Sequence, residues 1–437
     1  MKPTPRTSGP RIGRRTFLAT SAATGLALGL PASPAGAAGP GGRVFRSALS
    51  VSPFTELVLG SVALTDGTRT ARTVEQVQRL FKAHGATEVY ARIATLRDAP
   101  SGEAQHGLVR GLQRARLARS LGQPFNPEIG LFAVYGDISY QPEPDFSDYP
   151  GINPPGPWTS LTVDQMTPIL YRYGAAVARQ ILATGVRVGV WNLGNEIELG
   201  LAGVAIRGLV TQTDRWSYSP PDAIDPAIGQ MDFTTLIMMP EPDRIAWLEA
   251  HLWPHMGRML AATAAGIRSV SPTARFSSHT STIGAASTAL PVAFWAAMKK
   301  AGYHVSELGT SFYPTSNDYG DRLATFKDAA NALYSTFGKR VFVAELGYPS
   351  ATMPPPYAWN SPLPGYPISP EGEHALVRDL VAWGAGRGPL SGVRPWAPDF
   401  CVSGWQPMSH FTVSGSTAAA EPVLDAISEG LRLAEGA

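Results

Sequence analysis

The sequence VWNLGNE occupies Val190–Glu196, and the sequence VFVAELGY occupies Val341–Tyr348. In both segments a short apolar run leads into a glutamate. Apolar runs of this kind are typical of parallel strands that are buried on both faces. A carboxylate at the tip of a buried strand costs free energy unless it is paired or takes part in chemistry. Glu196 and Glu345 are therefore the first candidates for functional residues.

Outward from these segments, strand-like and helix-like patterns alternate along the chain. We expect strands at Glu56–Val62, Glu88–Ala94, Glu128–Tyr135, Arg187–Leu193, Ala274–His279, Glu307–Phe312, Arg340–Ala344 and Asp399–Gly404. We expect helices at Val74–Ala83, Glu103–Leu121, Val163–Leu182, Pro242–Val270, Ala289–Ala301, Asp321–Phe337, Gly372–Trp383 and Pro422–Leu433. Eight strands that are each followed by a helix predict one α/β domain, a single (β/α)8 TIM barrel. A doubly wound open sheet is the alternative, but no Gly-x-Gly-x-x-Gly follows the first expected strand.

Three of the expected loops after strands are long and carry aromatic residues and prolines. They are the third loop, Ile138–Ser160, the fourth, Ile197–Glu241, and the seventh, Tyr348–Pro370. Their aromatic residues are Tyr140, Phe146, Tyr149, Trp158, Trp216, Tyr218, Tyr357, Trp359 and Tyr366. Barrel enzymes build their active sites from these loops, and flat rings stack on the C–H faces of sugars. The alternative is that the rings only pack within their own loops.

The first 37 residues have the features of an export signal. Arg14 and Arg15 form a twin-arginine pair, and the weakly apolar stretch Phe17–Leu30 that follows is too short to span a bilayer comfortably. Ala35–Ala37 then supplies a small-x-small cleavage site. We therefore expect residues 1–37 to be a twin-arginine signal peptide, residues 38–437 to be the catalytic domain, and the protein to be secreted. A chance arginine pair before an apolar helix is the alternative.

The charge and cysteine content limit the partners of the domain. The formal net charge is +2, but residues 1–37 contain five basic residues and no acid, so the remainder carries −3. This gives no argument for a nucleic-acid partner, nor for a membrane partner once the signal is removed. The one cysteine, Cys401, excludes an internal disulfide and a cysteine-rich metal site. We expect a monomer.

The two glutamates are 149 residues apart and are expected to end strands four and seven. Hydrolysis of a glycosidic bond by double displacement needs one carboxylic acid to protonate the leaving oxygen and one carboxylate to attack the anomeric carbon. We expect Glu196 to be the acid/base and Glu345 the nucleophile, with their carboxyl groups about 5–5.5 Å apart. The alternatives are that Gly194–Glu196 is a capped turn and that Glu345 is a core ion-pair partner of Arg92.

Three more residues are expected to assist the two glutamates. Asn195 is expected to hold the sugar 2-hydroxyl, a contact that strengthens in the transition state. Arg92, at the end of strand two, is expected to keep Glu345 ionised. Tyr313, at the end of strand six, is expected to hydrogen-bond the nucleophile and orient it.

Three further residues are candidates for the lining of the site. Trp405 is expected to end strand eight and to form a platform for the sugar. His279, at the end of strand five, is expected to line the site. Asp137, after strand three, is a weaker candidate because a role in a loop turn explains it equally well.

This chemistry needs no metal and no organic cofactor, and we expect neither. His251 and His255 are four residues apart, as in a zinc-binding helix. The zinc motif needs a glutamate directly after the first histidine, where this chain has Leu252, and Pro254 lies between the two histidines. A structural role for the pair is therefore expected.

These motifs resemble the retaining clan of (β/α)8 glycoside hydrolases, and most closely glycoside hydrolase family 53, the arabinogalactan endo-β-1,4-galactanases. Leu193–Ile197 resembles the acid/base strand of that family, and Val343–Tyr348 its nucleophile strand. Gly309–Pro314 resembles its Ser-Tyr-Tyr-Pro sixth strand. Trp405–Pro407 resembles its Trp-Glu-Pro eighth strand, and Pro157–Leu161 also fits. The resemblance implies a retaining hydrolase of a polysaccharide, with β-1,4-galactan or arabinogalactan as the expected substrate.

The chain departs from the family in three places. Val134–Asp137 stands where the family has His-Tyr-Ser-Asp, Gln406 stands in place of the acid of Trp-Glu-Pro, and the fourth loop is longer. All three places bear on sugar recognition. The alternatives are therefore a hydrolase of the same clan that acts on another glycan, in endo or exo mode, and a non-catalytic sugar-binding barrel. A sugar-binding barrel is expected to have lost one catalytic carboxylate, and this chain has both.

Overall fold

The computed structural model describes residues 38–39, 43–97, 104–208, 223–282, 286–316, 320–355 and 357–436. All of them lie in one compact unit, Pro31–Ala437. The expected signal peptide, residues 1–37, lies outside the described residues.

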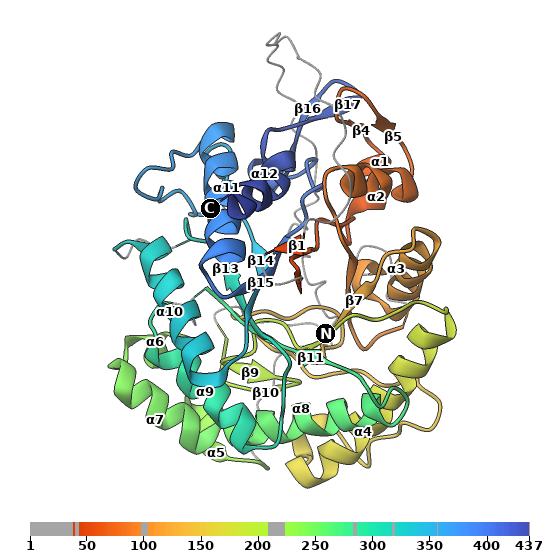
Figure 1. The fold of residues 1–437 in the computed structure, drawn as a ribbon. Coiled ribbons are helices and arrows are strands. Elements are labelled where there is room, and N and C mark those ends of the chain that lie inside the picture. The colour runs from red at the N-terminus through yellow and green to blue at the C-terminus, as the bar shows by residue number, and fades with distance from the viewer. Residues whose placement is uncertain are drawn as a thin grey trace, which may run out of the picture. The chain divides into compact units, whose positions relative to one another are not determined.

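Within the described residues, eight parallel strands form the centre of the domain and helices surround them (Figure 1). In chain order the strands are β3 (Arg46–Ser47), β6 (Val89–Ile93), β7 (Phe125–Ile129), β8 (Trp191–Leu193), β11 (Phe276–Ser277) with its continuation β12 (His279–Thr280), β13 (Leu308–Phe312), β14 (Val341–Leu346) and β15 (Leu390–Pro395). One arc pairs in the order β11-β8-β7-β6, and the other in the order β12-β13-β14-β15-β3.

The two arcs close into a barrel. They share the fifth strand, because β11 pairs with β8 and β12 pairs with β13 on either side of Ser278. At the other junction the backbone N–H of Thr87 donates to the carbonyl of Ser47, 2.9 Å away, and joins β3 to the start of β6. The architecture therefore agrees with the predicted (β/α)8 barrel and not with an open sheet.

The outer helices follow the strands in turn. They are α2 (Val74–Ala83), α3 (Leu108–Ser120), α4 (Val163–Ala183), α8 (Trp253–Arg268), α9 (Ala289–Lys300), α10 (Arg322–Phe337), α11 (Pro370–Gly386) and α12 (Val423–Glu435). Local capping explains several ends: Thr73 and Gln76 form a capping box at the start of α2, and Gly338 ends α10 in the left-handed conformation. The expected helix Pro242–Val270 is two helices, α7 (Glu241–His251) and α8, separated at Leu252.

Two of the strand predictions are wrong. Glu56–Val62 is not the first strand but contains the helix α1 (Thr55–Leu59), because the Glu56 carboxylate accepts hydrogen bonds from Arg110 and Arg114 on α3. Asp399–Gly404 is not the eighth strand. It lies in the loop after β15, where the Asp399 carboxylate accepts a hydrogen bond from the Thr55 hydroxyl.

Further short strands decorate the loops. The loops after β3 and β15 contribute β4 (Ala63–Thr65), β5 (Thr70–Ala71), β16 (Phe411–Ser414) and β17 (Thr417–Ala420) to one small sheet beside α2 (Figure 1). In the loop after β8, β9 (Gly200–Leu201) and β10 (Val204–Ala205) form a hairpin, and this loop also holds α5 (Pro226–Gln230) and α6 (Phe233–Met238). β1 (Ala38–Gly39) pairs with β2 (Arg43–Val44).

The barrel interior contains a polar layer near the amino ends of the strands. The Arg46 guanidinium donates to the carboxylates of Glu88 and Glu307, and the Asn126 amide also donates to Glu88. Glu88 and Glu307 are 2% and 3% exposed, so each depends on the arginine for its counter-charge. This layer, the Arg46 layer, lies below the carboxyl ends of the strands, where barrel active sites form.

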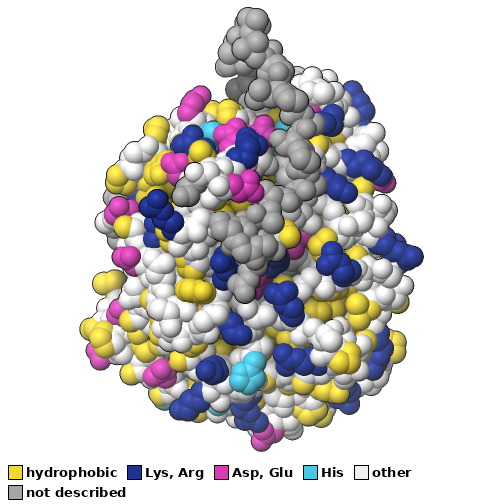
Figure 2. Space-filling view, in the orientation of Figure 1, with side chains coloured by type: hydrophobic (Ala, Val, Ile, Leu, Met, Phe, Trp, Pro, Cys, Tyr) yellow, Lys and Arg dark blue, Asp and Glu magenta, His cyan; other side chains and the backbone are white. Residues whose placement is uncertain are grey.

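No helix in the described ranges is both long and apolar enough to cross a membrane. On the face drawn in Figure 2, lysine and arginine side chains are spread among neutral and hydrophobic ones.

The close contact of α4 with α8 generates a stability prediction. A methyl group added at Gly266 on α8 would lie 2.0 Å from the backbone carbonyl oxygen of Tyr171 on α4, so the helices must move apart. We expect Gly266→Ala to lower the free energy of unfolding by about 1–3 kcal/mol. Gly386→Ala, whose new methyl group meets Ala434 at an ordinary 3.6 Å, should leave it unchanged or raise it by up to about 1 kcal/mol. Thermal unfolding of both variants checks this. Equal melting temperatures for Gly266→Ala and Gly386→Ala would contradict the close contact of α4 with α8.

Candidate active site

The two predicted catalytic glutamates lie at the carboxyl ends of strands β8 and β14 of the barrel. Glu345 is the second-last residue of β14, and Glu196 lies three residues after the end of β8. Gly194, which directly follows β8, has a φ of 77°, and Glu196 has a φ of 48°. A left-handed conformation is uncommon for a residue with a side chain and is concentrated at functional sites. This backbone turn lifts the Glu196 carboxyl group off the line of the strand.

Glu345 is held by two side chains that the sequence predicts as its partners. The Arg92 guanidinium donates through Nη2 to Glu345 Oε1. The Tyr313 hydroxyl donates to Glu345 Oε2 over 2.8 Å. Glu345 is only 5% exposed and Arg92 is 1% exposed. Both carboxylate oxygens are therefore fixed by donors before any substrate binds.

Asn195 completes this arrangement next to the acid. Its side-chain oxygen accepts from Arg92 Nη2 at 2.6 Å, and its amide nitrogen donates to the carbonyl of Gly136 at 2.8 Å. Arg92 thus joins the tip of strand four to the tip of strand seven. The structure brings Arg92, Asn195, Tyr313 and Glu345 into one hydrogen-bonded group, with Glu196 following Asn195 in the chain.

In the part of the chain that the structure describes, Glu196 has no ion pair with an arginine or lysine. Its carboxylate accepts a hydrogen bond of 3.3 Å from the backbone N–H of Ile138, and it is 8% exposed. Burial raises the pKa of Glu196 well above its ordinary value of 4.5, and the negative charges of Glu345, Asp137 and Glu198 raise it further. A carboxyl group in this environment holds its proton to higher pH than an ordinary glutamate and is suited to donate it.

The pKa of Glu345 is also raised, but cations and a hydroxyl donor oppose the effect of burial there. Burial raises the pKa of Glu345, but Arg92, Arg394 and the Tyr313 hydroxyl all act to lower it. Because it contacts a guanidinium and Glu196 does not, Glu345 is the carboxyl group of the two that ionises first. Two carboxyl groups whose environments separate their pKa values are what an acid and a nucleophile need.

Asp137 lies beside the acid but in a turn. Its Oδ1 accepts from the backbone N–H of Ser139 at 2.8 Å and from the Ser139 hydroxyl at 2.5 Å. The Gln141 amide donates to the carbonyls of both Asp137 and Asn195. Asp137 therefore shapes the loop that places the Ile138 N–H on Glu196, and its charge raises the pKa of the acid.

His279 is predicted to line the site, but its side chain is buried inside the barrel. It is fully buried, and its Nδ1 is 3.8 Å from Glu128 Oε2. Neither ring nitrogen has a hydrogen-bond partner among the described residues. Burial lowers the pKa of His279 to about 3, so the ring is neutral. The charged residue that His279 contacts is therefore Glu128 and not one of the two predicted catalytic glutamates.

The prediction that Trp405 ends strand eight is wrong. The strand β15 ends at Pro395, and the tryptophan at its tip is Trp396. The Arg92 guanidinium carbon lies 4.3 Å from the centre of the Trp396 ring, and the ring is partly exposed. Two Trp-x-Pro segments occur close together, at Trp396–Pro398 and Trp405–Pro407, and only the first follows the strand directly.

Trp405 still belongs to the edge of the site. Its ring lies 6.3 Å from that of Tyr313, 5.5 Å from that of Tyr357 and 5.7 Å from that of Trp359. Tyr357 and Trp359 come from the loop after β14, so this loop brings aromatic rings to the nucleophile side of the site.

The aromatic residues of the other long loops divide differently. Phe146 and Tyr149, after β7, pack against Tyr173 of α4. Trp158 packs on Phe146, and its indole N–H donates to the carbonyl of Ala202 in the loop after β8. Trp216 and Tyr218 lie outside the described residues.

Four functional candidates are not found from the sequence. Besides Trp396 they are Tyr90, Glu128 and Arg394, which lie in the barrel below Arg92. The Glu128 carboxylate accepts from Arg92 Nε at 2.5 Å, from the Tyr90 hydroxyl at 3.1 Å and from Arg394 Nη2. A charged residue inside a short strand was the available signal for Glu128 and Arg394, as it is for Glu345.

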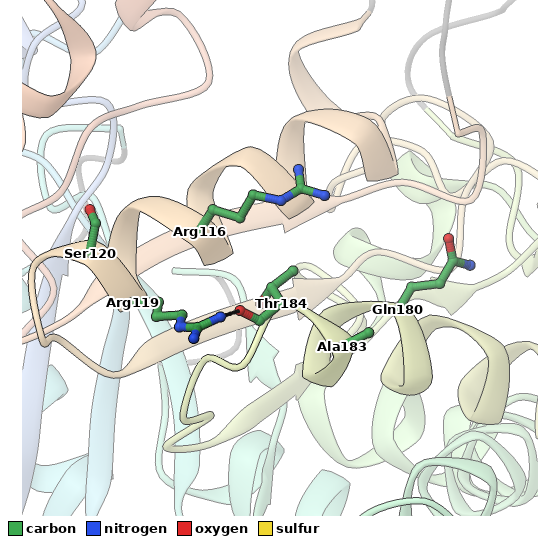
Figure 3. Close-up of a pocket in the computed structure, with 6 residues that line it drawn as sticks. All are labelled: Arg116, Arg119, Ser120, Gln180, Ala183 and Thr184. Atoms are coloured by element: carbon green, nitrogen blue, oxygen red, sulfur yellow. Dashed lines mark hydrogen bonds between the residues drawn. The ribbon is translucent and has the colours of Figure 1, made fainter.

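A pocket of about 500 Å³ lies elsewhere, between the ends of α3 and α4 (Figure 3). Arg119 of α3 donates across it to the carbonyl of Thr184 at 2.7 Å. None of the predicted site residues lines it, so it is separate from the candidate active site.

The described residues contain no group of three histidine, cysteine, aspartate or glutamate side chains that could hold a metal ion. His251 Nδ1 instead contacts Asp225 Oδ2 at 2.7 Å.

Comparisons with known proteins identify the class and the family. The family model described as Glycosyl hydrolase family 53 matches residues 64–429. The fold is similar to the GH53 catalytic domain of Ignisphaera aggregans, with a TM-score of 0.62, 16% identity, and coverage of 89% of this chain and 96% of that one. It is equally similar to a structure reported for two fungal β-1,4-galactanases, with a TM-score of 0.62, 17% identity, and coverage of 88% and 98%.

A curated relative matches over a shorter segment. It is a probable arabinogalactan endo-β-1,4-galactanase A of Aspergillus terreus, 33% identical over 91 residues. These residues are 21% of this chain, and they span about a quarter (26%) of the length of that relative.

The protein is therefore a glycoside hydrolase, an enzyme of the EC 3.2.1 class. The chain belongs to glycosyl hydrolase family 53, since the family model covers most of its length. The resemblance stated from the motifs is confirmed at the level of the family, and a polysaccharide substrate follows from membership of it.

The charge of Asp137 generates a prediction for the acid. Asp137→Asn removes a negative charge that disfavours ionisation of Glu196, so the pKa of Glu196 falls. If Glu196 is the predicted acid, activity depends on its protonated form, and the alkaline limb of kcat/KM against pH should move to lower pH. The exposed Asp148 of the same loop provides the control variant, Asp148→Asn. If the alkaline limb of Asp137→Asn coincides with that of the control, Asp137 acts only in the turn.

Proposed function

We propose that this protein is a secreted, retaining glycoside hydrolase that cleaves β-1,4-galactan or arabinogalactan. The observation that carries the proposal is the difference between its two buried glutamates. Glu345 is bound by Arg92 and Tyr313, whereas Glu196 contacts no cation and is surrounded by other acids. One carboxyl group is thereby prepared to attack and the other to donate a proton.

In the first step, Glu345 attacks the anomeric carbon and forms a glycosyl–enzyme ester. The bond from the anomeric carbon to the glycosidic oxygen breaks, and the proton of Glu196 goes to that oxygen. Tyr313 and Arg92 orient the attacking carboxylate, and Asn195 is placed to bind the sugar 2-hydroxyl.

In the second step, the ionised Glu196 removes a proton from water. The water oxygen bonds to the anomeric carbon, the ester to Glu345 breaks, and the sugar leaves with its original anomeric configuration. Glu196 and Glu345 return to their starting protonation states, so the cycle consumes only the polysaccharide and water.

The substrate is supported by the motifs and by the relatives. The partial relative in Aspergillus terreus is named an arabinogalactan endo-β-1,4-galactanase, and one structural neighbour is a fungal β-1,4-galactanase. The partly exposed ring of Trp396 at the barrel mouth, together with Tyr357 and Trp359 from the long loop after β14, supplies apolar faces for sugar rings. The long loops expected after strands three, four and seven are proposed to determine the choice between endo and exo cleavage.

Export by the twin-arginine pathway is proposed from Arg14, Arg15 and the Ala35–Ala37 cleavage site. The single cysteine suits a protein that folds before export, because no disulfide has to form outside the cell. Replacing Arg14 and Arg15 by lysine should retain the protein inside a host that secretes the parent.

The catalytic assignment predicts different losses for the two glutamates. Glu345→Ala should abolish hydrolysis of galactan, because no other group can form the ester. Glu196→Ala should reduce kcat/KM by about 10²–10⁴-fold, the usual contribution of a general acid. Glu249→Ala, an exposed residue of α7, should hydrolyse galactan like the parent.

The assay uses a panel of plant and bacterial polysaccharides with product sizes measured by chromatography. Release of oligosaccharides from galactan supports the substrate. Activity on another glycan that both substitutions remove would keep the mechanism and reject the substrate, and activity that survives both would reject the catalytic assignment. Glycan binding by the parent without hydrolysis would favour a sugar-binding barrel.

A further inference from the structure

Glu128 lies directly beneath the predicted catalytic machinery. It is on β7, opposite Arg92 in the register of β6 and β7, and it is fully buried. Its two carboxylate oxygens are divided between two arginines: Oε1 accepts from Arg92 Nε at 2.5 Å, and Oε2 accepts from Arg394 Nη2. The catalytic mechanism described above uses neither Glu128 nor Arg394.

The charges in this buried group balance only with Glu128 included. Arg92 and Arg394 carry two positive charges, and both side chains are inaccessible to solvent. Ionised Glu345 and Glu128 carry the two negative charges. Without Glu128, a single nucleophilic carboxylate would face two buried guanidinium groups, which is costly in a medium that solvates charge poorly.

The contacts also divide the guanidinium of Arg92 between two tasks. Its Nε edge is bound by Glu128, and its Nη2 binds Asn195 and Glu345. Because a guanidinium is planar and rigid, fixing the Nε edge fixes the direction of Nη2. Glu128 therefore orients Arg92 Nη2, the donor that hydrogen-bonds Glu345.

We propose that Glu128 is a positioning residue for the nucleophile, which orients Arg92 towards Glu345 and shares its positive charge. This inference rests on the proposed retaining mechanism. Without Glu128, Arg92 would bind Glu345 more tightly, and a more stabilised carboxylate is a weaker nucleophile. Glu128 thus directs Arg92 to Glu345 while it limits how strongly the positive charge stabilises that carboxylate.

Other ionisable groups lie around Glu128, and among them Glu345 changes its charge in the proposed reaction because it forms the ester. The groups are Tyr90 and Arg92 on β6, His106 after β6, His279 on β12, Glu345 on β14 and Arg394 on β15. The two arginines lower the pKa of Glu128 to about 2, and burial lowers the pKa of His279 and of His106 to about 3. Changing Glu128 therefore acts on the nucleophile mainly through Arg92 and Arg394.

The first test is Glu128→Gln assayed on an aryl β-galactoside with a 2,4-dinitrophenyl leaving group. This leaving group departs without a proton, so its hydrolysis depends on the nucleophile and not on Glu196. We expect kcat/KM of Glu128→Gln to fall by about tenfold or more, because one charge-assisted hydrogen bond that orients Arg92 is lost. Glu196→Ala should form the ester from the same substrate at close to the parent rate.

The matched control is Glu88→Gln in the Arg46 layer. Glu88 is also a buried carboxylate that binds an arginine and an amide, but it contacts neither Arg92 nor Glu345. A purely structural cost of removing a buried carboxylate should appear in both variants as a lower melting temperature. Only Glu128→Gln should change the chemistry of the folded enzyme.

The second readout is the pH dependence of the nucleophile. Removing the negative charge of Glu128 lowers the pKa of Glu345, so the acidic limb of kcat/KM should move to lower pH in Glu128→Gln and stay in place in Glu88→Gln. A carboxyl ¹³C NMR titration, with the Glu345 signal assigned by Glu345→Gln, measures the same change without any substrate. This titration judges the inference even if the proposed reaction fails.

A third variant covers a failure of Glu128→Gln to fold. Glu128→Asp keeps the charge but shortens the reach, so the acidic limb should stay near that of the parent while kcat/KM falls several-fold. The inference is overturned if Glu128→Gln, per folded molecule, matches Glu88→Gln in kcat/KM, acidic limb and Glu345 titration. If Glu128→Gln does not fold, the inference is overturned when Glu128→Asp shows the full activity of the parent.

Discussion

The site depends on one buried cation, the guanidinium of Arg92. It carries its charge into the barrel, where an isolated ion is very costly, and it is stable there only because carboxylates and an amide oxygen surround it. Because its partners are on β7, β14 and the tip of β8, the arginine joins three strands that are distant in sequence. The contacts of Arg92 therefore contribute both to the closed barrel and to the geometry of the site.

The arrangement explains how two like residues take different roles. Both glutamates are buried, and burial alone would leave both protonated. Arg92 and Tyr313 supply Glu345 with a positive charge and a donor, while Glu196 receives a backbone N–H and the repulsion of Asp137. Glu196 has a left-handed backbone, with φ of 48°, and Arg92 donates to Glu128, Asn195 and Glu345 but not to Glu196. The Arg46 layer below has no contact with either glutamate.

The sequence alone predicts the barrel and the two glutamates because an apolar run that leads into a charge is a strong local signal. It misses the first strand because β3 is only two residues long, and it mistakes Glu56–Val62 for a strand because ion pairs to α3 decide that segment. Glu128 escapes notice because the expected strand Glu128–Tyr135 begins at this residue, whereas β7 is Phe125–Ile129 and has Glu128 next to its carboxyl end. Trp396 is passed over because Arg394 and Pro395 interrupt the apolar pattern of β15. The missing information in each case is tertiary contact.

The measurement that tests the account most directly is covalent trapping with an activated 2-deoxy-2-fluoro-galactoside, followed by mass spectrometry of the protease-digested protein. The fluorine slows both steps and the good leaving group speeds the first, so the ester accumulates. The account predicts one sugar attached to the peptide that contains Glu345, and no label in Glu345→Gln. A label on Glu196, or turnover that inverts the anomeric configuration without any label, would contradict it.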